Sequence, residues 1–214
     1  MDKTAIKNFA IWARKKLIGD ISYKANLLGI TPEGIRNALP QSTGEIEFYD
    51  IGMQEPFAIS GKEIGQRRHL AELIRQKEDG SDYKTAYNSV IEEVAYTWFN
   101  RLIAVRFMEV NDYLPSHTRI LSSDSKTKLE PDIVTTPFDT ELFFTEQEKE
   151  QIIQWQHENA MDSLFMLLFI KACNALNALL PQLFETTADY TELLLNLSVT
   201  DRDGIIYRLG TVEK

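Results

Sequence analysis

Apolar side chains recur at intervals of three and four residues along most of the chain, a spacing that places them on one face of a helix. The first such stretch predicts an amphipathic helix from an N-cap at Asp2 to about Leu28, where Gly29 ends it in a left-handed conformation. The widest apolar stripe predicts a long central helix at about residues 82–112. Residues 164–180 are apolar on nearly all sides and predict a buried helix.

Shorter elements are indicated by residues that begin and end helices or strands. Thr31-Pro32 has the residue types of an N-cap and a first turn, and predicts a short helix that stops before Pro40. Two capping boxes predict helix starts at residues 60–63 and 145–148. A turn at residues 201–204, between apolar stretches, predicts the beginning of a β-hairpin. The other predicted elements are a short strand at residues 45–51 and a short helix at residues 190–197.

Together these elements predict a mainly α fold class: a helical domain around one long central helix, with irregular polar loops and little β structure. Residues 1–200 are expected to form this helical N-terminal domain, with a candidate sub-boundary in the irregular 40–59 loop. Residues 201–214 are expected to begin a following element that is cut short. The chain is therefore expected to be part of a longer protein.

The charge is distributed unevenly, which bears on the kind of partner. The chain of 214 residues has a formal net charge of −9, and residues 1–110 hold 15 basic against 15 acidic side chains, whereas residues 111–214 hold 8 against 17. An acidic surface repels phosphate, so the second half suits a protein partner better than nucleic acid. A single cysteine excludes an internal disulfide, and the N-terminus does not have the pattern of a signal peptide. We expect a soluble, cytoplasmic protein without a membrane span.

Residues with catalytic potential are few, and each has a simpler interpretation. The histidines, His69, His117 and His157, lack metal-ligand spacing, so solvated surface positions are the favoured interpretation. Cys173 lies in the predicted buried helix and is expected to be an unreactive core residue. Ser123–Lys126 matches the S-x-x-K pattern of acyl-transfer enzymes, but nothing in its polar loop would desolvate the lysine.

Two DNA-directed chemistries are also disfavoured. Pro131-Asp132 resembles the start of a PD…(D/E)-x-K nuclease site, which holds a metal-bound water, but Gln147 stands where the second carboxylate should be. Methyl transfer to adenine needs a glycine-containing cofactor loop and a Pro-Pro-aromatic loop that grips the flipped base. The sequence contains neither a Gly-x-Gly nor a Pro-Pro pair. No catalytic, cofactor-binding or metal-binding residue is therefore assigned.

Two stretches are candidates for contact with DNA. Residues 24–38 follow helix-turn-helix spacing, although tight packing around Gly29 explains the same residues and is favoured. The helix predicted after residue 60 has a basic face, although interspersed acids such as Glu63 and Glu72 favour a solvated helix side. The candidate contacts to phosphate or bases are Arg36, Lys62, Arg67 and Arg68.

The central helix carries two arginines beside its apolar stripe. We expect Arg101 and Arg106 to be structural, paired with carboxylates such as Glu109 or with carbonyls of a packed neighbour.

Several stretches carry a family resemblance. The run EEVAYTWFNRLIAVRFMEVNDYL, residues 92–114, resembles the helix that precedes the catalytic domain in the PglX family, the adenine-specific DNA methyltransferases of BREX phage-defence systems. The opening MDKTAIKNFAIWAR, residues 1–14, resembles the start of the same family. Shorter similarities follow in chain order at residues 20–25, 30–35, 37–42, 134–139, 169–174 and 189–196.

The resemblance implies that the full-length protein transfers a methyl group from S-adenosylmethionine to N6 of adenine in DNA. Members of the family carry their cofactor and adenine motifs beyond the region that this chain resembles, so the chain alone is expected to be inactive and to bind no cofactor. We expect a non-catalytic N-terminal scaffold or docking domain, whose partners are its own catalytic domain and other BREX components. DNA would be bound through the full-length protein. The alternative is a DNA-contacting module that assists target recognition.

Overall fold

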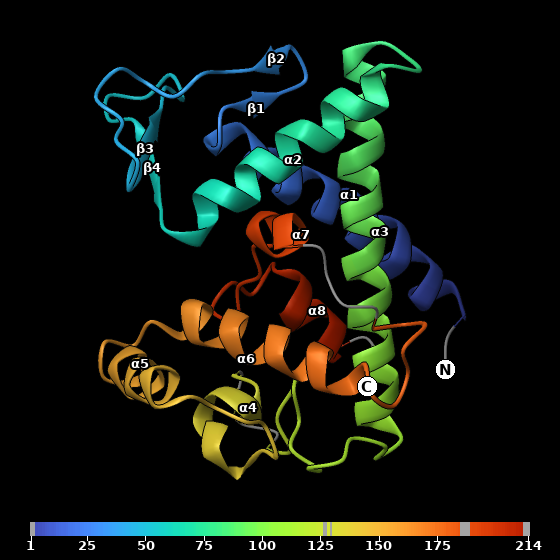
Figure 1. Ribbon diagram of the computed structural model, residues 1–214. Helices are drawn as coiled ribbons and strands as arrows, with labels where there is room; N and C mark the ends of the chain where they lie inside the picture. Colours follow the sequence, from blue (N-terminus) through green and yellow to red (C-terminus); the bar gives the residue numbers. More distant parts are fainter. Residues whose placement is uncertain (1–2, 126–127, 129, 185–188, 212–214) are drawn as a thin grey trace. The chain divides into compact units, whose positions relative to one another are not determined.

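A computed structural model of the chain describes residues 3–125, 128, 130–184 and 189–211 (Figure 1). Helices make up most of this part of the chain, and strands form only two small antiparallel hairpins, so the mainly α prediction is confirmed. The helices are α1 (Lys3–Leu27), α2 (Lys62–Glu78), α3 (Tyr83–Val110), α4 (Asp132–Thr135), α5 (Glu146–His157), α6 (Met161–Leu176), α7 (Asp189–Leu194) and α8 (Ile205–Thr211). A 3-10 turn, η1 (Pro137–Asp139), follows α4. The strands are β1 (Ile30–Thr31), β2 (Gly34–Ile35), β3 (Ile46–Tyr49) and β4 (Phe57–Ser60).

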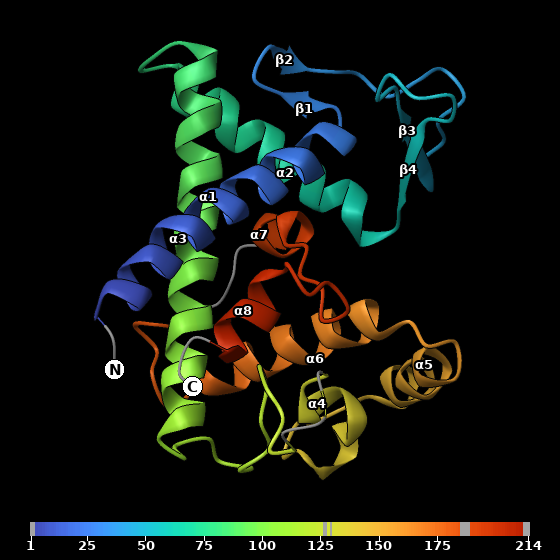
Figure 2. The ribbon, with the colours of Figure 1, turned by 180° about the vertical axis from the view of Figure 1, so that it is seen from behind.

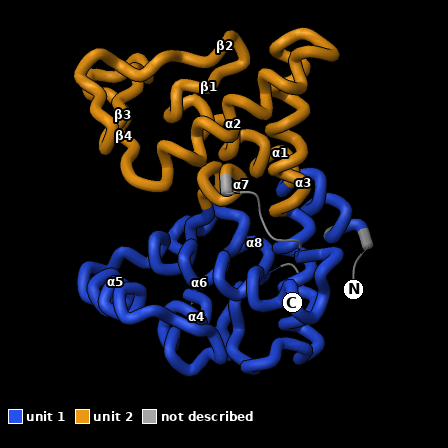
Figure 3. The backbone as a smooth tube through the Cα atoms, viewed as in Figure 1, with its two compact units in different colours: residues 1–13, 99–186, 197–214 blue, residues 14–98, 187–196 orange. Residues whose placement is uncertain are grey.

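The chain forms two compact units (Figure 3). Unit 1 contains residues 1–13, 99–186 and 197–214, and unit 2 contains residues 14–98 and 187–196. Both unit boundaries that lie in the first half of the chain fall inside helices, α1 and α3, rather than in linkers. The sequence-based division at residue 200 stays a prediction.

The long central helix is confirmed as α3, the longest helix seen from either side of the molecule (Figure 2). Its start is fixed by Asp82, whose carboxylate accepts hydrogen bonds from the Thr85 amide at 3.1 Å and the Thr85 hydroxyl at 2.7 Å. The first helix is also confirmed, although its predicted N-cap, Asp2, lies outside the described residues. Among the described residues, no helix combines the length and apolar composition needed to cross a bilayer.

The short helix predicted after Thr31 is wrong, because residues 30–35 form the β1–β2 hairpin instead. Gly29 adopts a left-handed conformation, with φ of +69°, and turns the chain away from the α1 axis. The Thr31 hydroxyl then donates to the Gly34 carbonyl at 3.2 Å and closes the tight turn. A helix-turn-helix is thereby contradicted, since no second helix occupies residues 30–38. The packing of Gly29 explains the sequence pattern instead.

The second hairpin, β3–β4, confirms the strand predicted at residues 45–51, but β4 was not anticipated. The capping box at residues 60–63 forms only in part. The Ser60 amide donates to the Glu63 carboxylate at 3.5 Å, while Gly61 is the N-cap and provides no side-chain bond. The box at residues 145–148 is confirmed in full, with bonds of 2.8 and 3.2 Å between Thr145 and Glu148.

In unit 1, α6 packs against α4 and α5 and buries most of its apolar side chains, as predicted. It ends at Leu176, however, and Leu179 and Leu180 of the predicted 164–180 helix are exposed. The β-hairpin predicted from residue 201 is wrong. After the 201–204 turn the chain forms α8, because Ile205, Ile206 and Leu209 have helical spacing and are all buried. Arg208 of α8 lies over the Trp12 ring, 4.2 Å from its centroid, so this segment is integrated into unit 1.

Candidate interaction surfaces

Of the four predicted DNA contacts, Arg67 is buried and forms hydrogen bonds within unit 2. It lies on α2 and is only 7% exposed. Its Nε donates to the Leu28 carbonyl at 2.7 Å and its Nη2 donates to the Arg36 carbonyl at 2.7 Å, which ties α2 to the ends of α1 and β2. The guanidinium also stacks on the Tyr49 ring, 3.9 Å from the centroid. Burial lowers the pKa of Arg67, and the nearby Tyr49 and Glu47 oppose this change.

Arg68, the next residue, is exposed but also has a partner within unit 2. Its Nη2 donates to Glu47 Oε1 at 2.8 Å, and Glu47 Oε2 accepts from the Tyr49 hydroxyl at 2.5 Å. Although burial raises the pKa of Glu47, the bonds from Tyr49 and Arg68 outweigh it and the net change is downward. Burial, followed by the bond to Glu47, raises the pKa of Tyr49 to about 12.

The other two predicted contacts, Arg36 and Lys62, are exposed. Arg36 donates to the Asp50 carbonyl and lines a hollow of about 440 Å³ between the end of α1, the β1–β2 turn and the β3–β4 loop. The structure brings Arg36 and Arg67 together through the Arg36 carbonyl. Contact of these four residues with DNA stays a prediction.

The second half of α3 contains a buried ion pair that confirms the structural role predicted for Arg106. Arg106 donates to Glu109 one turn later, and its Nη2 also donates to the Gly210 carbonyl at 3.3 Å. Glu109 accepts from the amides of Ile120 and Leu121 at 2.8 and 2.7 Å. It accepts from the Ser122 hydroxyl as well, at 2.6 Å. The pair therefore anchors the loop after α3 within unit 1.

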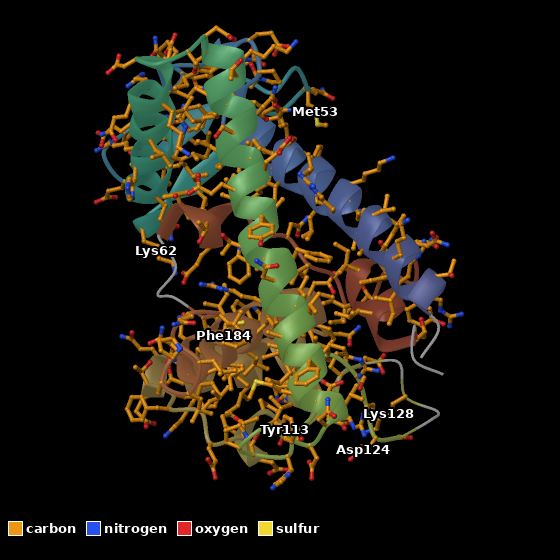
Figure 4. The ribbon with its side chains drawn as sticks, turned by 90° about the vertical axis from the view of Figure 1, so that its right-hand side faces the viewer. Met53, Lys62, Tyr113, Asp124, Lys128 and Phe184 are labelled. Atoms are coloured by element: carbon orange, nitrogen blue, oxygen red, sulfur yellow. The ribbon has the colours of Figure 1, made fainter. Side chains whose placement is uncertain are left out.

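An apolar surface lies on another face of the same half of α3. It consists of Ile103, Phe107 and Val110, at spacings of four and three residues, and of Tyr113 just after the helix; we call it the α3 apolar surface. These side chains are 38%, 60%, 42% and 60% exposed, respectively. The rings of Phe107 and Tyr113 lie edge to face with centroids 6.1 Å apart. Figure 4 shows Tyr113 beside the end of α3.

The α3 apolar surface was missed because Ile103 and Phe107 belong to the apolar stripe that was assigned to the core. A helix that is apolar around much of its circumference does not reveal which side is covered. The signal available was the width of the stripe, which exceeds what one packing face requires.

The residues considered for their catalytic potential are the three histidines, Cys173 and the S-x-x-K segment. His69, His117 and His157 are exposed, as predicted, and the described residues contain no cluster of three or more His, Cys, Asp or Glu suited to a metal ion. Cys173 is buried, and burial raises the pKa of its thiol to about 12. Lys126 of the S-x-x-K pattern lies outside the described residues.

The acidic residues considered for a nuclease also have structural partners. Asp132 accepts from the Ser123 hydroxyl at 2.6 Å and the Asp124 amide at 2.9 Å, and so closes the loop before α4. Glu148 caps α5 and pairs with Lys171 of α6 at 2.9 Å. These carboxylates stabilise local structure.

Comparison with known proteins shows a similarity to part of two methyltransferases. No protein-family model matches the chain. The chain is 45% identical over 213 residues to the adenine-specific methyltransferase PglX of Lacticaseibacillus casei, covering 96% of the chain and 17% of that protein. It is 29% identical over 209 residues to the adenine-specific methyltransferase BrxX of Escherichia coli, covering 96% of the chain and 16% of that protein. The chain thus matches the N-terminal region of PglX and spans about a sixth of the length of these relatives.

Proposed function

We propose that this chain is the non-catalytic N-terminal docking region of an adenine-specific DNA methyltransferase, and that the α3 apolar surface binds the remainder of that enzyme. The observation that carries the proposal is the exposure of Ile103, Phe107 and Val110 on one face of α3, and of Tyr113 just after it. Exposed apolar side chains that gather on one surface are typical of a site that another molecule covers. Burying it on docking would contribute roughly 25 cal/mol for each Å² removed from water.

The similarity to two methyltransferases supports this assignment, since the chain matches only a small part of each. The sequence lacks the glycine loop and the Pro-Pro-aromatic motif that methyl transfer needs, so the chemistry would belong to the remainder of the enzyme. In this proposal the whole enzyme uses S-adenosylmethionine, methylates N6 of adenine and acts in the cytoplasm within a BREX system. Other components of that system are further candidates for docking.

The proposal can be tested with a chimera in which this chain replaces the matching region of Lacticaseibacillus casei PglX. Phe107→Asp places a charge on the α3 apolar surface and is expected to reduce adenine methylation of host DNA strongly. The same variant, expressed as a separate chain, should no longer co-purify with the remainder of PglX. Phe143→Asp is the matched control, because Phe143 is 83% exposed and lies outside that surface.

If Phe107→Asp and Val110→Asp left both methylation and co-purification unchanged, docking through the α3 apolar surface would be wrong. If the chain did not associate with the remainder of PglX at all, the docking role would fall as a whole.

A second candidate function is contact with DNA by unit 2. It is favoured by the exposed side chain of Arg36 at the 440 Å³ hollow and by exposed Lys62 and Arg68 on α2. Binding of the chain to duplex DNA over a salt series distinguishes the two functions. Phosphate contacts would give an affinity that falls steeply with salt, and Lys62→Ala would reduce that slope by about one. No binding at low salt would leave docking as the function.

A further inference from the structure

Unit 1 contains an open apolar hollow of about 270 Å³, separate from the α3 apolar surface. One wall is the end of α6 with the residues just after it, and the opposite walls are the loop that follows α3 and the segment after η1. The floor consists of side chains that are at most 6% exposed: Leu114, Ile120, Ile133 and Leu176.

The hollow exists because small side chains line the α6 wall. Ala172, Ala175 and Ala178 follow one another at intervals of three residues, and larger side chains at these positions would fill the space. Ala175 and Ala178 are exposed, and Leu179 at the rim is 56% exposed. An apolar floor that is open to water gains free energy when an apolar group covers it.

The lining favours an apolar group as the occupant of the hollow. The hollow has a volume of about 270 Å³, and its lining is apolar apart from Ser116, Thr140 and Glu141. A protein interface commonly places one bulky apolar anchor in a pocket of this type.

The charge at the rim indicates what surrounds that anchor. Glu141 is exposed and lines the hollow. Its charge helps to raise the pKa of His117, after the larger effects of the hydrogen bond to Asp112 and of the Asp112 charge. The second half of the sequence is strongly acidic, with 17 acidic against 8 basic residues in 111–214. A cationic partner is electrostatically complementary to this rim.

We propose that the hollow binds one leucine or aromatic side chain from a cationic amphipathic helix of a partner protein, whose lysine or arginine side chains meet Glu141. An amphipathic helix presents an apolar anchor and flanking charges on adjoining faces, which matches an apolar floor beside an acidic rim. This inference does not depend on the methyltransferase assignment, because it rests on other residues of unit 1.

The probe for this proposal is a synthetic helical peptide of about 16 residues, with leucine on one face and lysine on the other. Its binding to the chain is followed by fluorescence anisotropy. Ala175→Trp fills the hollow without changing charge and is expected to weaken binding roughly thirtyfold, the effect of losing one anchor. Glu141→Lys is expected to weaken it by about tenfold. Ala58→Trp, on the exposed face of β4, is the matched control and should leave binding unchanged.

Circular dichroism establishes that each variant is folded. Leu179→Asp, at the exposed rim, provides a second test in case Ala175→Trp does not fold. The proposal is overturned if the peptide fails to bind the native chain, or if folded Ala175→Trp or Leu179→Asp binds it as tightly as the native chain. It is also overturned if a peptide with alanine in place of every leucine binds equally well, because charge alone would then explain the interaction.

Discussion

Two ion pairs of α3 show how burial decides what a charged residue contributes. Arg106 and Glu109 are both buried, with side chains 8% and 0% exposed, and Glu109 also accepts from two amides and a hydroxyl. The pair between Glu93 and Lys77 of α2 is open to water, with side chains 54% and 33% exposed. The buried Arg106–Glu109 pair has lost its hydration and depends on its protein partners, whereas the exposed Glu93–Lys77 pair keeps its hydration.

Glu109→Gln is therefore expected to destabilise the chain by about 3–5 kcal/mol, because it leaves the Arg106 charge buried without a compensating carboxylate. The free energy of unfolding in urea is the measurement. Glu93→Gln is the control and should change it by about 1 kcal/mol or less. Equal effects of the two substitutions would show that Glu109 is not the anchor of the loop after α3.

Cys173 provides a pH-dependent prediction. Burial raises the pKa of its thiol from the ordinary 9.0 to about 12, and the charge of Arg101 opposes this change. Above pH 9 the unfolded chain loses the thiol proton while the folded chain keeps it, so folding stability falls as pH rises. Between about pH 8 and pH 10 this group should remove about 1.4 kcal/mol.

The measurement is the free energy of unfolding of the native chain and of Cys173→Ala at both pH values. The alanine variant should show the smaller loss, since the tyrosines and lysines titrate equally in both proteins. Rapid reaction of native Cys173 with a thiol reagent at about pH 8 would contradict the burial on which the prediction rests.

At the scale of elements, Gly29 joins α1 to the β1–β2 hairpin and requires glycine for two reasons. Its φ is +69°, and an added Cβ would lie 3.0 Å from Tyr49 Cδ1 and 3.3 Å from Arg36 Cβ. Gly29→Ala is expected to cost at least about 2 kcal/mol from the left-handed backbone and the crowded ring. Thermal or urea unfolding measures this loss.

Gly19, inside α1, is the matched control, because an added Cβ would meet nothing within 4 Å. Gly19→Ala should stabilise the chain by about 0.5–1 kcal/mol, since alanine is the better helix former. If both substitutions had the same sign, the conformation assigned to Gly29 would be in error.

Local sequence signals predicted the elements whose structure is decided locally. Helical periodicity placed α1, α3 and α6, and the Thr145–Glu148 capping box formed in full. The β1–β2 hairpin was missed because Thr31-Pro32 has the residue types of a helix N-cap and first turn, whereas Ile30 pairs with Ile35 across two strands. Their pairing depends on the turn at Gly29 and on Arg67, which is distant in sequence and binds the carbonyls on either side of the hairpin.

Tertiary contacts that the local sequence does not reveal also determine the surroundings of a residue predicted to contact DNA. Arg67 was assigned to a basic surface because of its charge, yet it is three residues from both Ile64 and Leu70, which are buried on α2. Its position in the apolar stripe was the available signal. The sequence could not show that the carbonyls of Leu28 and Arg36 accept hydrogen bonds from Arg67, because they become its partners only when α1 and β2 approach α2.

At the scale of the whole molecule, the units follow tertiary contacts and not chain order. Unit 2 includes residues 187–196, where α7 lies, because α7 packs against α2 and Trp98 Nε1 donates to the Thr191 carbonyl at 2.9 Å. A sequence-based boundary groups neighbours in the chain, whereas each unit combines segments that are distant in the chain, and helices α1 and α3 each contribute to both units.

The last prediction concerns the cofactor. Because the sequence contains no Gly-x-Gly loop and no Pro-Pro-aromatic motif, the chain alone is expected not to bind S-adenosylmethionine. A ligand that binds only the native state, at about 100 times its Kd, stabilises it by about 2.7 kcal/mol, which for a chain of this size raises Tm by roughly 5–10 °C. A thermal scan with saturating S-adenosylmethionine should therefore show no shift for this chain, while full-length PglX of Lacticaseibacillus casei should show one. A shift for the chain alone would reveal a cofactor pocket within residues 1–214, and the assignment of catalysis to the remainder of the enzyme would then be wrong.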